Sequence, residues 1–226
     1  MKKPEFGENI NQRVGLFGGT FNPIHFGHLR AAEEIREFFN LDQVIFIPSG
    51  IPPHKISENI VPPRHRFNMV KLAIQDNPGF WVSDFEIKSP TISYSIITIK
   101  HFRENLGENT ALFFLLGIDA FLEINTWKDL HQLFYLIDFI VMSRPGYNQK
   151  LNANLSLIDE NKKFLYNAKS NCYIHTSGHK LFFQEITLLD FSSRIIRQRI
   201  RNEQSIRYLV PSTVEEYIKK NELYQE

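Results

Sequence analysis

The 226-residue sequence has a single cysteine and almost no excess charge, and it lacks any long hydrophobic run. The one cysteine, Cys172, excludes an intrachain disulfide and a cysteine-rich zinc site, and it fits a reducing compartment. The formal net charge of +1 argues against a general electrostatic surface for nucleic acid. No apolar run approaches the roughly 18 residues of a membrane span, and no apolar segment follows the charged start at 1–5 to form a signal peptide. We therefore expect a soluble cytoplasmic protein that binds neither nucleic acid nor membrane.

The common glycine-rich nucleotide signatures, GxGxxG and GxxxxGK[ST], are also absent. Their place is taken by GGTFNPIHFGH, from Gly18 to His28, between the apolar run 14–17 and a helix expected over 29–40. Glycines let the backbone approach a polyphosphate, and a helix start offers unpaired N–H groups at the positive end of its dipole. His25 lies three residues before His28, so both rings can face the same way and donate to a phosphate oxygen. The stretch predicts a phosphate site.

Apolar runs alternate with helical patterns along the rest of the chain. The expected strands are 14–17, 44–47, 80–83, 111–116, 139–142, 172–174 and 186–189. The expected helices between them are 29–40, 64–75, 93–102, 119–124 and 128–136. This alternation predicts an α/β fold with a doubly wound, Rossmann-like parallel sheet, flanking helices and a small C-terminal helical extension. We expect one domain, 1–226, with a polar tail at 1–12, an α/β core at 13–191 and a helical part at 192–226, and a surface excursion with some helix at 147–170.

Several polar residues follow the ends of predicted strands, where doubly wound folds bind ligands. Gly117 and Asp119 come directly after the strongest apolar run, although Asp119 can equally be the N-cap of the next helix. Trp127 is either core or a platform for a flat aromatic ligand. The proline-rich loop 51–55 includes Lys55. A lysine in such a loop is more often solvated than bound to a ligand.

A second candidate anion site follows the last predicted strand. Ser192 or Ser193 can cap the helix that begins there, and Arg197 lies one turn further on. Hydroxyls, helix N–H groups and a guanidinium together can hold an anion. Alone, these residues indicate a cap and a surface arginine, but beside the first motif they favour phosphate binding.

Together these segments resemble the bacterial nicotinate-nucleotide adenylyltransferases of the HxGH nucleotidyltransferase superfamily. The matching segments are 18–28, 47–55 (IPSGIPPHK), 93–95, 117–119, 126–128, 143–146 (SRPG), 192–197 and 205–211 (SIRYLVP). The resemblance implies adenylyl transfer from ATP to nicotinate mononucleotide, which gives deamido-NAD and pyrophosphate in NAD biosynthesis. It also implies Mg²⁺, carried with the ATP phosphates and not by a metal site of the protein. The substrate's own phosphate would be the nucleophile, so positioning and charge stabilisation can suffice.

The same resemblance implies roles for particular residues. Those implied to be catalytic are His25, His28 and Arg197. Those implied to bind ATP are Gly18, Gly19, Thr20, Phe21, His25, His28, Gly117, Asp119, Ser192, Ser193 and Arg197. Those implied to bind the acceptor nucleotide are Ser49, Gly50, Lys55, Tyr94, Ser95, Trp127, Lys128 and Arg144, with Trp127 stacked on the pyridine ring. The chain departs from the family pattern at Asn22 for Asp, Ser95 for Thr, Ile97 for Asp and Arg194 for Thr or Ser.

The sequence leaves alternatives open. A sibling transferase would use nicotinamide mononucleotide or phosphopantetheine as the acceptor, and Trp127 with the SRPG segment weighs against phosphopantetheine. A nucleotide-binding regulator without activity would account for Arg194, whereas His25, His28 and Arg197 weigh against it. A metal site at the two histidines lacks a nearby third ligand. Selectivity for acid over amide and the formation of a homo-oligomer are not determined by the sequence.

Overall fold

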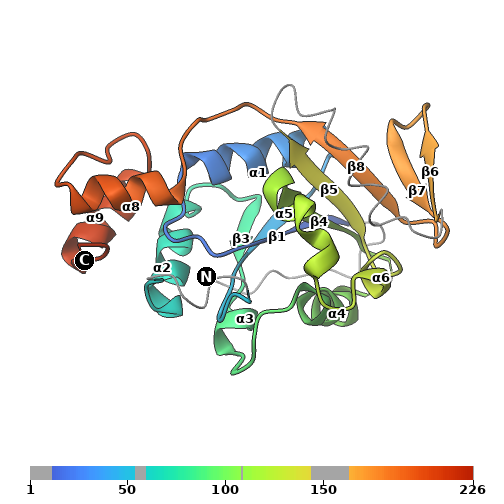
Figure 1. Ribbon diagram of the computed structural model, residues 1–226, viewed down its shortest axis with the longest axis horizontal. Helices are drawn as coiled ribbons and strands as arrows, with labels where there is room; N and C mark the ends of the chain where they lie inside the picture. Colours follow the sequence, from blue (N-terminus) through green and yellow to red (C-terminus); the bar gives the residue numbers. More distant parts are fainter. Residues whose placement is uncertain (1–11, 54–59, 108, 144–162, 226) are drawn as a thin grey trace.

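The computed structural model describes residues 12–53, 60–107, 109–143 and 163–225 of the chain. Its centre is an eight-stranded sheet in the order β3-β2-β1-β4-β5-β8-β7-β6 (Figure 1). The strands are β1 (Arg13–Gly19), β2 (Gln43–Pro48), β3 (Phe80–Val82), β4 (Ala111–Gly117), β5 (Asp138–Ser143), β6 (Phe164–Asn167), β7 (Cys172–His175) and β8 (Lys180–Glu185). From β3 to β8 in that order the strands run parallel, whereas β7 pairs antiparallel with both β6 and β8.

The doubly wound α/β fold with a parallel sheet is confirmed, and the sheet has in addition an antiparallel part at the β6–β7 end. A parallel pair needs a crossover of about a dozen residues or more, whereas a short turn can join antiparallel strands. Only residues 168–171 and 176–179 separate β6, β7 and β8. These three strands therefore form an antiparallel extension of the parallel sheet.

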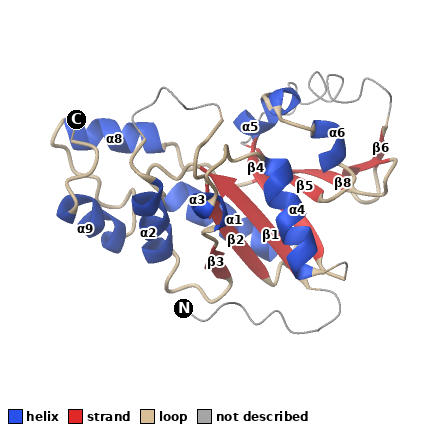
Figure 2. Ribbon diagram, turned by 90° about the horizontal axis from the view of Figure 1, so that it is seen from below, coloured by secondary structure: helices blue, strands red, loops and turns tan. Residues whose placement is uncertain are grey.

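Helices cover both faces of the sheet (Figure 2). They are α1 (Phe26–Phe38), α2 (Pro63–Ala73), α3 (Phe85–Lys88), α4 (Ser95–Leu106), α5 (Ile118–Leu122), the 3₁₀ turn η1 (Ile124–Thr126), α6 (Leu130–Leu133), α8 (Ser193–Arg201) and α9 (Ser212–Lys220). One hydrophobic cluster joins the sheet to α1, α2, α8 and α9, and the other joins it to α4, α5 and α6. The expected helix 128–136 is wrong in extent, because Asp129 has a left-handed φ of 53° and the helix begins only after it.

Strand β4 illustrates how the apolar pattern builds these two layers. Successive side chains of a strand point to opposite faces of a sheet. Accordingly, Phe113 and Leu115 belong to the cluster under α1, while Leu112, Phe114 and Leu116 belong to the cluster under α4 and α5. A strand buried on both faces has a continuous apolar sequence, as this one does.

The last parallel strand lies earlier in the chain than expected. The sequence predicts a strand at 186–189, but β8 is Lys180–Glu185, paired with β5 from Phe139↔Leu181 to Ser143↔Glu185. Strand β5 ends at Ser143, whose carbonyl accepts from the Ile186 N–H at 3.2 Å, and residues 187–189 continue past the end of this pairing. Strand β6 lies within the segment 147–170 expected to be a surface excursion; residues 147–162 fall outside the described residues.

The C-terminal helices lie beyond α2 at one end of the molecule (Figure 1). The Tyr217 hydroxyl of α9 lies 3.0 Å from Nδ1 of His65 and accepts from Nδ2 of Asn68 at 2.9 Å, so polar contacts add to the apolar packing between α9 and α2. The division into a core at 13–191 and a helical part at 192–226 stays a prediction. In the described part of the chain, no helix is both long and apolar enough to cross a membrane.

Candidate active site

The loops that leave β1, β2, β4 and β8 converge at one edge of the sheet and enclose two cavities. The first cavity is lined by Gly18, Gly19, Thr20, Ser49, Pro52, Pro53, Glu86, Ser93, Tyr94, Ser95, Phe114, Leu116, Ala120, Glu123, Thr126, Trp127 and Lys128. The second cavity is lined by Phe17, His25, Gly27, His28, Ala31, Gly117, Ile118, Asp119, Met142, Ser143, Ile186, Thr187, Leu188, Leu189 and Phe191. Helix α5 contributes side chains to both cavities, so the two adjoin along it.

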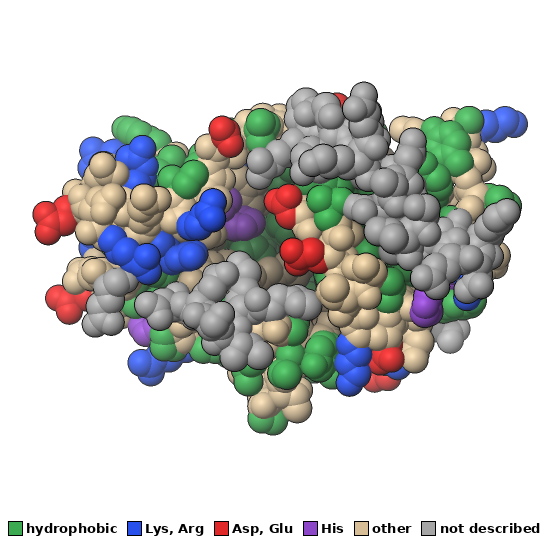
Figure 3. All heavy atoms as spheres, in the orientation of Figure 1, with side chains coloured by type: hydrophobic (Ala, Val, Ile, Leu, Met, Phe, Trp, Pro, Cys, Tyr) green, Lys and Arg blue, Asp and Glu red, His purple; other side chains and the backbone are tan. Residues whose placement is uncertain are grey.

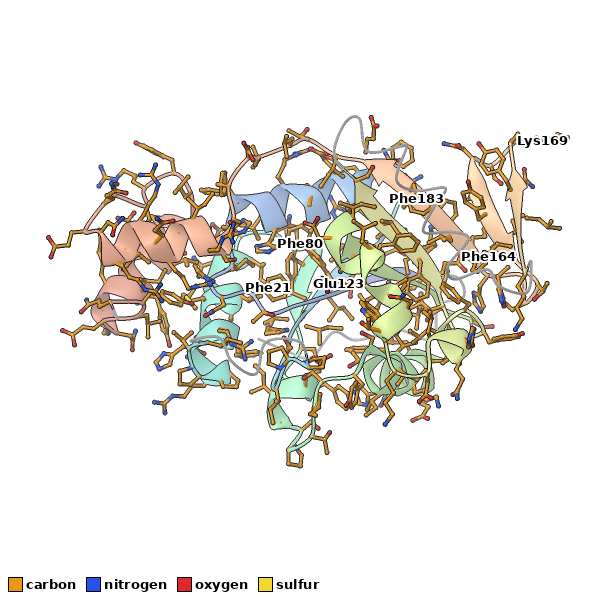
Figure 4. The ribbon with its side chains drawn as sticks, viewed as in Figure 1. Phe21, Phe80, Glu123, Phe164, Lys169 and Phe183 are labelled. Atoms are coloured by element: carbon orange, nitrogen blue, oxygen red, sulfur yellow. The ribbon has the colours of Figure 1, made fainter. Side chains whose placement is uncertain are left out.

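Charge is distributed unevenly around this region. Figure 3 shows the face hollowed near its centre, with a histidine at the rim, basic side chains gathered on the side of α8 and acidic side chains on the side of α5. Figure 4 shows Phe21 in the segment after β1 and Glu123 at the end of α5. A polyphosphate and a divalent cation would each find partners of opposite charge here.

The two histidines stand at the start of α1. His25 is the N-cap, with extended backbone, and its ring stacks on that of His28 with 3.7 Å between ring centroids. The His25 backbone N–H donates to Nδ1 of His28 at 3.3 Å, so the neutral His28 ring carries its hydrogen on Nε2. Phe21 packs edge-on against His28, with ring centroids 5.1 Å apart. The sequence prediction that both rings share one side of the helix start agrees with this geometry.

Both histidines are neutral at neutral pH. Burial lowers the pKa of His25 to about 4. Burial, and then the neighbouring His25, hold the pKa of His28 well below its ordinary value, although part of its side chain stays accessible in the second cavity. Nδ1 of His25 is buried and has no hydrogen-bond partner among the described residues. The pair therefore offers N–H donors without positive charge.

The loop after β1 turns sharply over its own glycines. Phe21 has a left-handed φ of 47° and folds its ring back over the chain. A Cβ on Gly19 would lie 2.9 Å from Cζ of Phe21, closer than such atoms approach. A side chain at position 19 would therefore displace the Phe21 ring. Gly18, Gly19 and Thr20 all line the first cavity.

The loop after β2 is fixed to the loop after β1 and to the start of α4. The Ser49 backbone N–H donates to the Gly19 carbonyl at 2.9 Å, and the Gly50 backbone N–H donates to Oγ of Ser93 at 2.9 Å. A Cβ on Gly50 would lie only 2.2 Å from the carbonyl oxygen of Glu86, so glycine alone fits there. This contact determines how closely the two loops and α3 approach.

Four of the predicted acceptor-binding residues, Tyr94, Ser95, Trp127 and Lys128, line the first cavity together. The Trp127 ring stands edge-on to Phe114, with centroids 5.8 Å apart, and stays half-buried. Nζ of Lys128 lies over the Tyr94 ring, 4.8 Å from its centroid. Tyr94 is the N-cap of α4 and Ser95 its first residue. The wall thus combines a flat aromatic surface, a hydroxyl and a cation.

The second cavity brings together Gly117 and Asp119 with the histidines. Gly117 is the N-cap of α5, and Asp119 lies in the first turn of that helix. The structure therefore excludes the N-cap alternative for Asp119 and leaves its carboxylate in the cavity wall. A carboxylate near a helix N-terminus is favourably placed with respect to the helix dipole.

Ser192, Ser193 and Arg197 make hydrogen bonds within the protein, and their part in anion binding stays a prediction. Ser192 caps α8 by accepting from the Ile195 N–H at 3.4 Å. The Ser193 hydroxyl donates to the Pro23 carbonyl, and Nη1 of Arg197 donates to the Asn22 carbonyl, each at 2.8 Å. In the described part of the chain none of the three lines either cavity. They hold the segment that leads into His25.

Two predicted acceptor-binding residues, Lys55 and Arg144, lie outside the described residues. Sequence reasoning missed Glu86, Glu123 and the segment 186–191, which line the cavities. It also missed Arg66. This residue lies three and four positions before the apolar Met69 and Val70, a helical spacing that places it on the buried face of α2. Glu86 accepts from the Thr98 hydroxyl at 2.6 Å, and burial raises its pKa.

Comparison with known proteins agrees with this geometry. The cytidylyltransferase-like family model matches residues 16–199. A "Probable nicotinate-nucleotide adenylyltransferase" of Geotalea daltonii is 42% identical over 215 residues, which are 95% of this chain and 99% of that relative. One of Geobacter sp. is 42% identical over 212 residues, 94% of this chain and 98% of that protein. The solved structure "Plasmodium falciparum nicotinic acid mononucleotide adenylyltransferase complexed with NaAD" shares the fold, with a TM-score of 0.69 at 19% identity over 94% of this chain and 97% of that one. The chain thus belongs to the cytidylyltransferase-like family and, within it, to the nicotinate-nucleotide adenylyltransferases.

Proposed function

We propose that this chain transfers the adenylyl group of ATP to nicotinate mononucleotide and forms deamido-NAD and pyrophosphate. The observation that carries the proposal is the stacked pair His25 and His28 at the start of α1, beside two adjoining cavities. Two cavities suit two nucleotide substrates, and donors at the helix start suit the phosphates between them. The relatives with this name support the same reaction.

We assign ATP to the second cavity and the acceptor to the first. His28 offers its Nε2–H to a phosphate oxygen of ATP, and Asp119 and Gly117 lie across the same cavity. Trp127 and Tyr94 provide aromatic surface for the pyridine ring of the acceptor. Lys128 places a cation in that wall, and its charge favours the carboxylate of a nicotinate over the neutral amide of a nicotinamide.

In the reaction, an oxygen of the acceptor phosphate attacks the α-phosphorus of ATP. The bond from that phosphorus to the bridging oxygen breaks, and pyrophosphate leaves with the electron pair. The attacking phosphate is already anionic at neutral pH, so no side chain has to remove a proton. The protein contributes alignment of the two nucleotides and N–H donors aimed at the phosphate oxygens. Ser193 and Arg197 act indirectly. Their hydrogen bonds to the carbonyls of Pro23 and Asn22 fix the segment that precedes His25.

A divalent cation fits this donor set. Mg²⁺ is usually held by one or two carboxylates together with substrate phosphates and waters. Asp119 in the second cavity is the carboxylate placed for that role. No cluster of three or more His, Cys, Asp and Glu suited to a metal ion occurs in the described residues. When bound, the cation supplies charge neutralisation of the phosphates.

The proposal is tested by pyrophosphate release from the purified protein with ATP and Mg²⁺. Nicotinate mononucleotide, nicotinamide mononucleotide and phosphopantetheine are offered in parallel, and the dinucleotide product is identified by mass. Turnover with the acid at a kcat/KM at least tenfold above that with the amide supports the proposal. A preference for another acceptor overturns the assigned substrate. ATP binding without release from any acceptor overturns the reaction and favours a nucleotide-binding regulator.

A further inference from the structure

Arg66 is a buried cation in α2 to which neither the sequence motifs nor the proposed chemistry assigns a role. Its side chain is fully buried, with 0% of its surface exposed, and it is the largest side chain so enclosed among the described residues. Moving an unpaired charge out of water costs several kcal/mol even after relaxation, so a buried cation needs good hydrogen-bond partners. The partners of Arg66 therefore indicate what this residue is for.

These partners are carbonyl oxygens from three separate segments. Nη1 donates to the Thr20 carbonyl at 2.8 Å, and Nη2 donates to the Gly50 carbonyl at 3.0 Å. Nε donates to the Val61 carbonyl at 3.1 Å, just before α2 begins. The planar guanidinium presents its donors in a rigid fork, so it fixes the relative positions of the groups that it bonds. Burial lowers the pKa of Arg66 only to about 10, and the group stays charged at neutral pH.

Two of the three segments form the walls of the first cavity. Thr20 belongs to the loop after β1, and Gly50 belongs to the loop after β2. On its other side Gly50 abuts the Glu86 carbonyl so closely that no Cβ fits. The loop after β2 is thus held between the guanidinium of Arg66 and the backbone of α3. No other described hydrogen bond links α2 to both loops.

We propose that Arg66 is a positioning residue for adenylyl transfer, which holds the loop at Thr20 and the loop at Gly50 at the separation that aligns acceptor and ATP. This inference rests on the proposed function for its reaction and on the hydrogen bonds of Arg66 for its geometry. Thr20 follows the glycines proposed to approach the phosphates, and Ser49 and Pro52 flank Gly50 in the acceptor cavity.

The test compares Arg66→Met and Arg66→Lys with Arg64→Met. Arg64 lies on the same helix but is exposed, so its replacement is a matched control for losing an arginine from α2. We expect Arg66→Met to lower kcat roughly tenfold to a hundredfold, the order expected for misplaced reactants, and to raise KM for both substrates. Arg66→Lys keeps the charge without the fork, and we expect an intermediate loss. Arg64→Met keeps wild-type constants.

A second measurement separates this inference from the proposed reaction. Amide hydrogen exchange is followed in peptides that contain Thr20 and Gly50, in the same three variants. We expect faster exchange in both loops for the Arg66 variants, with the central strands still protected, and no change for Arg64→Met. Were wild type inactive on every acceptor, the proposed function would fail while the exchange data still decided the geometry.

The inference is overturned if both loops exchange as in wild type, or if the Arg66 variants lose Vmax at unchanged KM. The latter is the result for a residue that only keeps the fold intact, since fewer folded molecules do not alter KM. Should Arg66→Met fail to fold, the kinetic constants and the amide exchange of Arg66→Lys test the proposal by themselves. Wild-type KM values and wild-type exchange in that variant would then contradict the proposal.

Discussion

The buried pair His25 and His28 makes stability depend on pH in a calculable way. Burial lowers the pKa of folded His25 to about 4, whereas an unfolded histidine has about 6.5. Between these two values the unfolded chain binds more protons than the folded one. The stabilisation is therefore intact above pH 6.5 and is lost progressively as the pH falls from there towards 4. Low pH should destabilise the protein through this residue.

The size of the effect follows from the two pKa values of His25. A difference of one pKa unit corresponds to about 1.36 kcal/mol. At pH 5 the unfolded histidine is almost fully protonated and the folded one is mostly neutral, which gives a loss of about 2 kcal/mol relative to pH 7. His28 adds in the same direction, since its pKa is also lowered by burial and by His25. Burial raises the pKa of Glu86, which acts in the opposite direction.

The assay is urea denaturation at pH 7 and pH 5, followed by circular dichroism, for wild type and His25→Gln. Contributions from Glu86 and the other acids are common to both proteins and cancel in the difference between them. We expect wild type to lose about 2 kcal/mol more than the variant between the two pH values. His131→Gln removes an exposed histidine of α6 and is the matched control, which we expect to follow wild type. Equal losses in wild type and His25→Gln would refute the reasoning, because the histidine would then titrate alike in the folded and unfolded chain.

Three further predictions concern single side chains. His28→Ala should lower kcat roughly a hundredfold, the order found for a lost donor to a developing charge, with a melting temperature near that of wild type; near-normal turnover would sink its proposed role. Gly50→Ala should cost about 1–3 kcal/mol or more in urea denaturation, because its Cβ meets the Glu86 carbonyl, while Gly18→Ala, with ordinary contacts, should change little. Trp127→Ala should raise KM for the acceptor by the equivalent of about 1–3 kcal/mol of lost stacking, with KM for ATP unchanged in steady-state kinetics. An equal rise in both KM values would show that Trp127 acts through the fold of the cavity and not through stacking.

Local sequence patterns predicted the structure correctly where residues close together in the chain are also close together in space. The apolar run 14–17, the glycines and the helical pattern after them predict a strand, a turn and a helix, and the structure has β1 and α1 there. His25, the N-cap, and His28, the third residue of α1, are three residues apart, and the local geometry of a helix start brings two such side chains together. The alternating faces of β4 follow in the same way from a period of two.

The sequence did not predict which distant segments pair with one another, and its predictions were less accurate where such pairing decides the structure. The apolar run 186–189 has the composition of a strand, but the register with β5 places β8 at Lys180–Glu185 and leaves the run at the rim of the second cavity. The sequence predicts an anion site at Ser192 and Ser193, but it does not show where these hydroxyls bond within the protein. In the structure Ser193 bonds Pro23, which lies 170 residues earlier, and no local rule selects that partner.

The sequence by itself determined the α/β class and the β1–turn–α1 arrangement, and it predicted the residues that donate to a nucleotide, because these depend on periodicity and on side-chain chemistry. Only the tertiary structure decided that Gly50 must lack a Cβ, that the histidines are neutral and that Arg66 links two loops. Each of these properties depends on burial and on contacts between segments far apart in the chain. Burial and long-range contact exist only once the sheet has assembled and its loops have met at one edge.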